Sequence, residues 1–167
     1  MTLDWSFQPD PDLKGSYYRR IEDIPRALTK FGVSKLSPNS AAQFIAYYYG
    51  AEKLAKAIAG INKDQPAKDA FGRFVSVKLP ETKYAASKMK LKISEPRLDA
   101  LFEHQWQRKQ PTSAITIRNR LSHDFGPTQV WHIHQHAPRL IPIMVTFIGD
   151  IDRVLKHLHA LWATKHP

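Results

Sequence analysis

The sequence predicts an all-α fold, a single-domain bundle of four to five helices. In several long segments the apolar residues recur at steps of three and four, which is the spacing of one buried helical face. No segment alternates convincingly with period two, and glycine is sparse, at 7 of 167 residues. A hydrophobic content of 43% in a chain of this length favours one compact core over two.

Residues 1–36 are mixed in character, and we expect an N-terminal extension laid on the core. Residues 8–12 are rich in turn formers, and residues 21–31 support at best a short helix around Pro25. Ser37 and Pro38 then predict a helix start, with a capping hydroxyl followed by a proline whose missing N–H costs nothing there. We therefore place the helical bundle in residues 37–167.

The clearest helix is predicted over residues 41–61. Its apolar positions share one face: Ala41, Phe44, Ile45, Tyr48, Ala51, Leu54, Ala55 and Ile58. Core packing is therefore a better interpretation of Phe44 and Tyr48 than base stacking, whereas Tyr47 and Tyr49 point elsewhere and suit a dimer interface. Glu52 lies beside the apolar face, and an internal arginine such as Arg118 is its candidate partner.

The middle of the chain predicts a shorter helix over residues 67–77, a basic loop over residues 78–94 and a third helix. Lys88 and Lys90 in that loop are candidate contacts to a phosphate backbone, although a solvated surface explains them equally well. Ser94 opens the third helix, which we expect to end at Pro111. Its predicted buried face carries Leu98, Leu101, Phe102 and Trp106.

A fourth helix is predicted over residues 113–124, ended by Gly126 and Pro127, and a long core helix over residues 140–163. A connector rich in histidine lies between them. It contains His132, His134 and His136. Three histidines suggest a metal site, but no nearby carboxylate other than Asp124 completes a ligand set. We therefore favour a polar connector and predict neither a metal nor another cofactor.

Composition narrows the function further. A formal net charge of +10 favours a polyanionic partner such as nucleic acid. The chain has no cysteine, which excludes disulfides and thiol catalysis. We expect a cytoplasmic protein, because there is no signal-peptide pattern and no uncharged apolar stretch of about 18 residues. Motifs for P-loop nucleotide hydrolysis, zinc proteolysis and serine hydrolysis are absent from the sequence.

One short segment carries the components for cleaving a phosphodiester in RNA. His123 titrates near neutral pH and suits a general base, and Arg118 suits the stabilisation of charge on a phosphate. Asn119 would orient the phosphate or the imidazole, and Arg120 is a further candidate contact to RNA. An ideal helix places Arg118 and His123 on different faces, so they converge only if the arginine reaches around the helix or a second copy contributes. The alternative is a structural pair at a helix end.

The segment Arg118-Asn119-Arg120-Leu121-Ser122-His123 resembles the signature of the HEPN superfamily (higher eukaryotes and prokaryotes nucleotide-binding domains): arginine, a polar residue, three variable residues and histidine. Residues 44–57 are similar to the first long helix of these domains. The order also fits, because the motif precedes the last long helix. The resemblance covers about residues 37–164 at the level of the superfamily.

This resemblance implies an α-helical bundle, commonly a homodimer, that is often a metal-independent endoribonuclease serving as a toxin or defence effector. An antitoxin or a nucleotidyltransferase would then be a partner. In many toxin members a tyrosine follows two residues after the histidine, whereas this chain has Phe125 there, without the hydroxyl. Some members are inactive, so the alternative function is a non-catalytic helical module that binds nucleic acid, a nucleotide or a protein.

Overall fold

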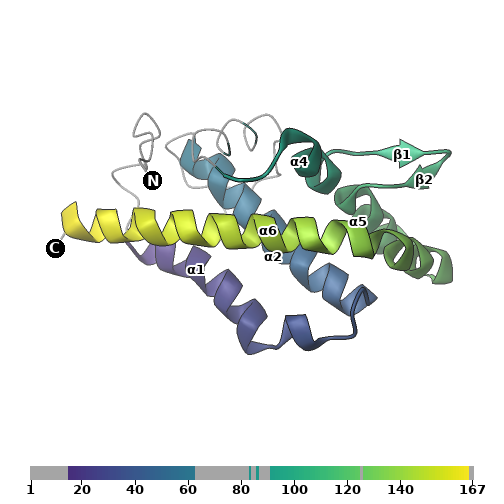
Figure 1. Ribbon diagram of the computed structural model, residues 1–167, viewed down its shortest axis with the longest axis horizontal. Coiled ribbons are helices and arrows are strands. Elements are labelled where there is room, and N and C mark those ends of the chain that lie inside the picture. The colour runs from purple at the N-terminus through teal and green to yellow at the C-terminus, as the bar shows by residue number, and fades with distance from the viewer. Residues whose placement is uncertain (1–14, 63–82, 84–85, 87–90, 125, 166–167) are drawn as a thin grey trace.

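The computed structural model describes residues 15–62, 83, 86, 91–124 and 126–165. Within these ranges the chain forms five bounded α-helices, a short 3-10 helix and one two-stranded sheet, which confirms the predicted all-α class (Figure 1). The elements are α1 (Gly15–Lys30), η1 (Val33–Lys35), α2 (Ala41–Asn62), α4 (Glu95–Phe102), β1 (Trp106–Gln107), β2 (Gln110–Pro111), α5 (Ala114–His123) and α6 (Pro127–Lys165). The expected helix over residues 67–77 lies outside the described residues.

The bundle is assembled around α6, which runs the length of the molecule (Figure 1). It contains 39 residues, so it is about 60 Å long at 1.5 Å per residue. α1 and α2 pack against it and against each other, and α4 and α5 also pack against it. The sheet lies at the same end of the molecule as α5 and the start of α6 (Figure 1). No helix in the described ranges is both long and apolar enough to span a membrane.

The core forms where α2 crosses α6. Phe44 and Tyr48 of α2 are completely buried, which confirms their predicted place in the core. At Gly50 the helices approach so closely that a Cβ built there would lie 2.9 Å from Leu28 Cδ1 of α1 and 3.6 Å from Ile148 Cδ1 of α6. A side chain at Gly50 would therefore require the Leu28 side chain to move.

α2 begins at Ala41, three residues after the start that Ser37 and Pro38 predicted. Ser40, rather than Ser37, caps it: the Ser40 Oγ accepts from the Gln43 backbone N–H at 3.1 Å. The Gln43 side chain reaches back, and its Oε1 accepts from the Asn39 N–H at 3.1 Å. This arrangement resembles a capping box, but the Gln43 side chain binds the N–H of Asn39, while the N–H of Ser40 donates to the Ser37 carbonyl at 3.0 Å. Ser37 and Pro38 lie in the turn before it.

Two helices are longer than expected. The N-terminal helix begins at Gly15 and carries Pro25 inside it, and its partly buried Ile24 and Leu28 pack on the core. The segment rich in histidine is not a connector but the first part of α6, which starts at Pro127 and continues through Pro138 and Pro142. A proline can follow the end of one helix or occupy the first position of the next. Pro127 does both here, so the sequence pattern placed the start of α6 too late.

The third helix is shorter than expected. α4 ends at Phe102, so Trp106 is not on its buried face; it lies in β1 and its side chain is 53% exposed. β1 and β2 pair antiparallel, with Trp106 opposite Pro111 and Gln107 opposite Gln110. Arg108 and Lys109 join the strands with φ angles of 50° and 65°. Two consecutive left-handed residues are typical of the type I′ turn that closes a two-residue hairpin loop.

Candidate functional site

The motif helix α5 is fixed at its N-terminus by a buried polar cluster. Ser113 is the N-cap, and its Oγ accepts from the Thr116 backbone N–H at 3.4 Å and lies 2.7 Å from Thr116 Oγ1. The Gln105 N–H donates to both oxygens, at 3.3 Å to Ser113 and 3.1 Å to Thr116. The chain before the hairpin is thus held to the first turn of α5, and the hairpin is held with it.

Arg118 faces α2, where it contacts Glu52. Its Nη2 lies 2.7 Å from Glu52 Oε1, and 3.5 Å from the Tyr48 hydroxyl. The guanidinium carbon lies 5.3 Å from the ring centroid of Tyr48 and 6.0 Å from that of Tyr49. Burial, reinforced by the charge of Glu52, raises the pKa of the Tyr48 hydroxyl above its usual range, so the hydroxyl stays neutral. The structure confirms the expected contact between Glu52 and Arg118.

His123 lies in a different environment. It is the last residue of α5 and is exposed, whereas the Arg118 side chain is only 22% exposed. Asn119 is half-buried and lies one turn before His123, so these two share a face that Arg118 does not. None of the three lines either hollow described below. Within one chain, then, the structure does not bring Arg118 and His123 together.

The structure describes only one of the other three residues predicted to contact RNA. Arg120 is exposed on α5. Lys88 and Lys90 lie outside the described residues, as does Phe125. Lys83, in the same basic segment, is helical and lies 2.7 Å from carboxylate oxygens of both Glu95 and Asp99. These two carboxylates raise the pKa of Lys83, and the pair ties this lysine to α4.

Two of the three histidines share a face of α6 that is turned inward. His132 is buried and His136 half-buried, and both lie one turn apart beside the buried Ile133 and Ala137. Burial and then the charge of Arg120 lower the pKa of His132, which also places Arg120 near it. Burial and then the charges of Arg139 and His132 lower the pKa of His136. Both imidazoles are therefore neutral at pH 7.

His134 projects from a different face of α6. It lies beside a shallow, mostly apolar hollow whose lining residues are Gly126, Pro127, Val130, Trp131 and His134. Trp131 is 51% exposed, and its ring lies edge-on to His132 at 5.2 Å between centroids. Across the part of the chain that the structure describes, no group of three or more histidine or acidic side chains is arranged to hold a metal ion.

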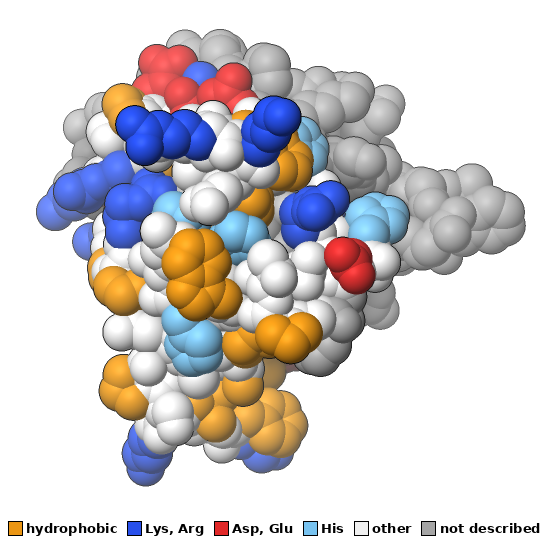
Figure 2. Space-filling model, turned by 90° about the vertical axis from the view of Figure 1, so that its right-hand side faces the viewer, with side chains coloured by type: hydrophobic (Ala, Val, Ile, Leu, Met, Phe, Trp, Pro, Cys, Tyr) orange, Lys and Arg blue, Asp and Glu red, His pale blue; other side chains and the backbone are white. Residues whose placement is uncertain are grey.

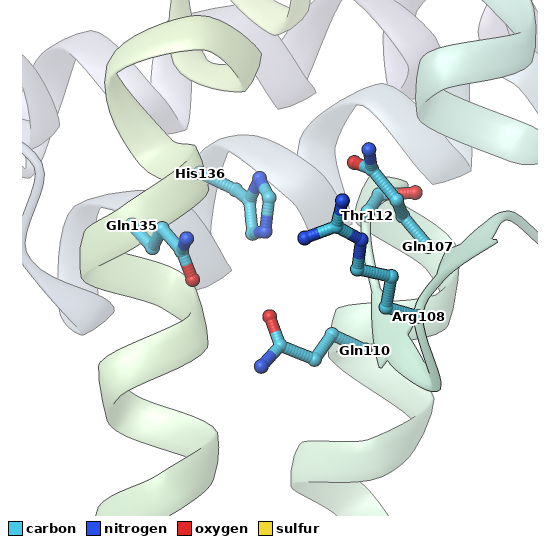
Figure 3. Close-up of a pocket in the computed structure, with 6 residues that line it drawn as sticks. All are labelled: Gln107, Arg108, Gln110, Thr112, Gln135 and His136. Atoms are coloured by element: carbon cyan, nitrogen blue, oxygen red, sulfur yellow. The ribbon is translucent and has the colours of Figure 1, made fainter.

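A second, polar pocket lies between the hairpin and α6 (Figure 3). Its volume is about 270 Å³, and it is lined by Gln107, Arg108, Gln110, Thr112, Gln135 and His136. Arg108 and His136 point toward one another across it (Figure 3). Sequence reasoning missed this site because it placed Trp106 and its neighbours on a helix. The available signal was the polar run from Gln107 to Gln110, which contains no apolar residue.

These elements share one face at an end of the molecule. Viewed from that end, Lys, Arg and His side chains are interspersed with hydrophobic ones (Figure 2). Comparisons with known proteins add no relative, because no family profile, no curated protein and no solved structure matches this chain.

Proposed function

We propose that this chain binds single-stranded RNA on the face formed by the hairpin, α5 and the N-terminal half of α6. The observation that carries the proposal is the mixture of exposed cations and exposed tryptophans on that face. Arg108, Lys109 and Arg120 are exposed there, and Trp106 and Trp131 are 53% and 51% exposed. Cations that follow a backbone and aromatic rings on which bases stack are how proteins bind single strands without reading a duplex.

Fluorescence anisotropy with a labelled single-stranded RNA tests this proposal. With three phosphate contacts, the logarithm of the binding constant should fall with the logarithm of salt concentration with a slope of about −2. Arg120→Ala should reduce the magnitude of that slope by about 0.7. Trp131→Ala should weaken binding by about tenfold through lost stacking. Lys35→Ala is the matched control, since Lys35 is an exposed cation on η1, away from this face. Equal losses for Arg120→Ala and Lys35→Ala would overturn the proposal.

A second candidate function is metal-independent cleavage of the bound RNA by a homodimer. Asn119 and His123 are accessible on one face of α5, while Glu52 fixes the orientation of Arg118 on the adjacent face. His123 would remove the proton from a ribose 2′-hydroxyl, whose oxygen attacks the adjacent phosphorus. The 5′-oxygen leaves and takes up a proton from solvent, and the product carries a 2′,3′-cyclic phosphate. Arg118 would stabilise the added negative charge on the phosphate oxygens.

A second copy is required because one chain does not bring Arg118 and His123 to a shared pocket. With two α5 helices facing each other, His123 of one chain would lie near Arg118 of its partner. A role as a toxin or defence effector, with an antitoxin or nucleotidyltransferase partner, is supported by the family resemblance alone.

RNA cleavage in EDTA tests this candidate. His123→Ala should abolish activity without unfolding the protein, because His123 is exposed at a helix end. His104→Ala removes an exposed histidine outside α5 and should leave activity unchanged. Sedimentation should show a dimer at the concentrations that cleave. Absence of cleavage by the native protein, or equal activity of the two variants, would refute the catalytic role.

A further inference from the structure

The pocket between the hairpin and α6 has the dimensions and chemistry of a site for a small polar anion. Its volume of about 270 Å³ is near the lower end of the range for small-molecule sites, roughly 300–1,000 Å³. The lining contains one guanidinium, one imidazole, one threonine and three glutamines, and no acidic residue. Within the described residues, no ion pair engages Arg108, so its charge is available to a ligand.

The walls of the pocket are held in place independently of any ligand. Arg139 of α6 donates from Nη2 to the Thr112 carbonyl at 2.6 Å, which joins the end of the hairpin to the helix. Behind it, the Gln105 N–H binds the Ser113 and Thr116 hydroxyls that begin α5. A pocket whose walls are already fixed loses little conformational entropy when it is filled.

One buried group in the pocket lacks a partner. His136 Nε2 is inaccessible to solvent and has no hydrogen-bond partner. Leaving such a group unpaired costs about 1–3 kcal/mol. Because the atom has no exposed surface, a ligand recovers part of this energy only when a neighbouring side chain moves aside. The imidazole is neutral because burial, and then the charges of Arg139 and His132, lower its pKa. It can therefore accept a hydrogen bond as well as donate one.

The turn that supplies Arg108 has unusual residues. Arg108 and Lys109 adopt φ angles of 50° and 65°, where glycine and asparagine are the usual occupants. Each such residue lowers the stability of the folded state by on the order of 1 kcal/mol. Asn-Gly would adopt the same turn with less strain. The Arg108 side chain extends from this turn back toward α6 (Figure 3). A cation in a strained turn, directed into a pocket, favours a role in binding.

We infer that this pocket binds one nucleoside monophosphate unit, with the phosphate on Arg108 and the base edge on the glutamine amides. Amides carry both donors and acceptors, as base edges do, and a guanidinium can contact two phosphate oxygens. This inference rests on the proposed binding of RNA, which makes a nucleotide of the strand the occupant. A free nucleotide has the same chemistry, so the experiment must separate the two sources.

Two variants test the pocket, and one control is matched to them. Arg108→Asn removes the guanidinium but keeps a residue that tolerates positive φ, so the hairpin is preserved. Lys109→Asn removes one charge from the same turn at a residue that does not line the pocket. Gln135→Glu changes an exposed lining amide to a carboxylate of the same shape, which repels an anion. Thermal unfolding verifies that all three are folded.

The measurement is anisotropy of a short labelled single-stranded RNA at about 0.15 M salt, where charges farther apart than about 8 Å are screened. We expect Arg108→Asn and Gln135→Glu to weaken RNA binding by about tenfold. Lys109→Asn removes one backbone contact outside the pocket, so it should weaken RNA binding by about fourfold and leave competition by AMP unchanged. AMP should compete for the native protein more strongly than either adenosine or inorganic phosphate. Equal effects of Arg108→Asn and Lys109→Asn on competition by AMP would overturn the pocket.

The same data separate failure of the pocket from failure of the proposed function. If RNA binds and Arg120→Ala weakens it while Arg108→Asn does not, the pocket is refuted and the RNA-binding face stands. If AMP binds in a manner that depends on Arg108 while RNA does not bind, the pocket is upheld for a free nucleotide and the proposed function is refuted. If neither AMP nor RNA binds, both are refuted.

Discussion

Arg118 Nη2 lies 2.7 Å from Glu52 Oε1. The two residues are 66 positions apart in the sequence, and their contact joins α5 to α2. The Glu52 side chain is only 11% exposed, and its other cation, Lys56, is 3.9 Å away. The pair therefore serves the fold whether or not Arg118 also contacts a phosphate. Any loss of activity in an Arg118 variant must be separated from a loss of stability.

A double-mutant cycle measures this pair. Arg118→Met should lower the free energy of unfolding by about 2 kcal/mol, because it leaves a largely buried carboxylate with only a distant partner. Glu52→Gln should cost about 1 kcal/mol, and the double variant should cost less than the sum by about 1–2 kcal/mol. Urea unfolding of the four proteins gives the coupling. Strict additivity would show that the contact contributes nothing in solution.

The close approach of three helices at Gly50 predicts that a large side chain at this position destabilises the protein. Gly50→Leu should destabilise the protein by about 2 kcal/mol, because its Cβ alone would overlap Leu28 of α1. Gly149→Leu is the control, since nothing lies within 4 Å of a Cβ at that exposed position of α6. It should stabilise the protein by about 0.5–1 kcal/mol through helix propensity. Similar melting temperatures for the two variants would contradict this packing.

The N-caps of α5 and α4 should respond differently to the same substitution. Ser113→Ala removes an oxygen that accepts from the N–H groups of Gln105 and Thr116, and it should cost about 1–2 kcal/mol. Ser94 caps α4 without a side-chain hydrogen bond, so Ser94→Ala should change stability by less than about 0.5 kcal/mol. Thermal unfolding compares them, and equal effects would argue against the buried polar cluster at the start of α5.

Stability should decrease in mild acid because of the two inward-facing histidines. The folded state lowers the pKa of His132 and His136 below the ordinary value of 6.5, so the unfolded chain binds more protons as pH falls through that value. The contribution of these two histidines to the free energy of unfolding is therefore fully present above about pH 7. It declines from about pH 6.5 downward, toward their pKa in the folded state. The melting temperature should fall between about pH 7.5 and about pH 5.5.

His136→Gln should reduce that fall in melting temperature, because it removes one of the two groups. His134→Gln is the control: it lies on the same helix, but it is exposed. A pH dependence that is the same in both variants would show that burial of His136 does not influence stability.

The sequence was informative where a helix carries one clear apolar stripe. α2 and α5 were predicted within a few residues, and the contact of Glu52 with Arg118 was anticipated because an acid beside an apolar stripe needs a partner. The hairpin was missed because two-residue strands are too short to alternate and Arg108-Lys109 is not a usual turn pair. The pocket was missed with it, since it exists only once the hairpin folds against α6.

The two internal prolines of α6 interrupt its backbone hydrogen bonding. Pro138 and Pro142 have no N–H, so the backbone carbonyls of His134 and Pro138 receive no bond from within the helix. Both prolines are exposed, and water can satisfy these carbonyls. The interruption lies between the turns that carry His132, His134 and His136 and the part of the helix that places Ile148 beside Gly50 of α2. We therefore expect the amides on the two sides of Pro138 and Pro142 to exchange as two classes within one continuous helix.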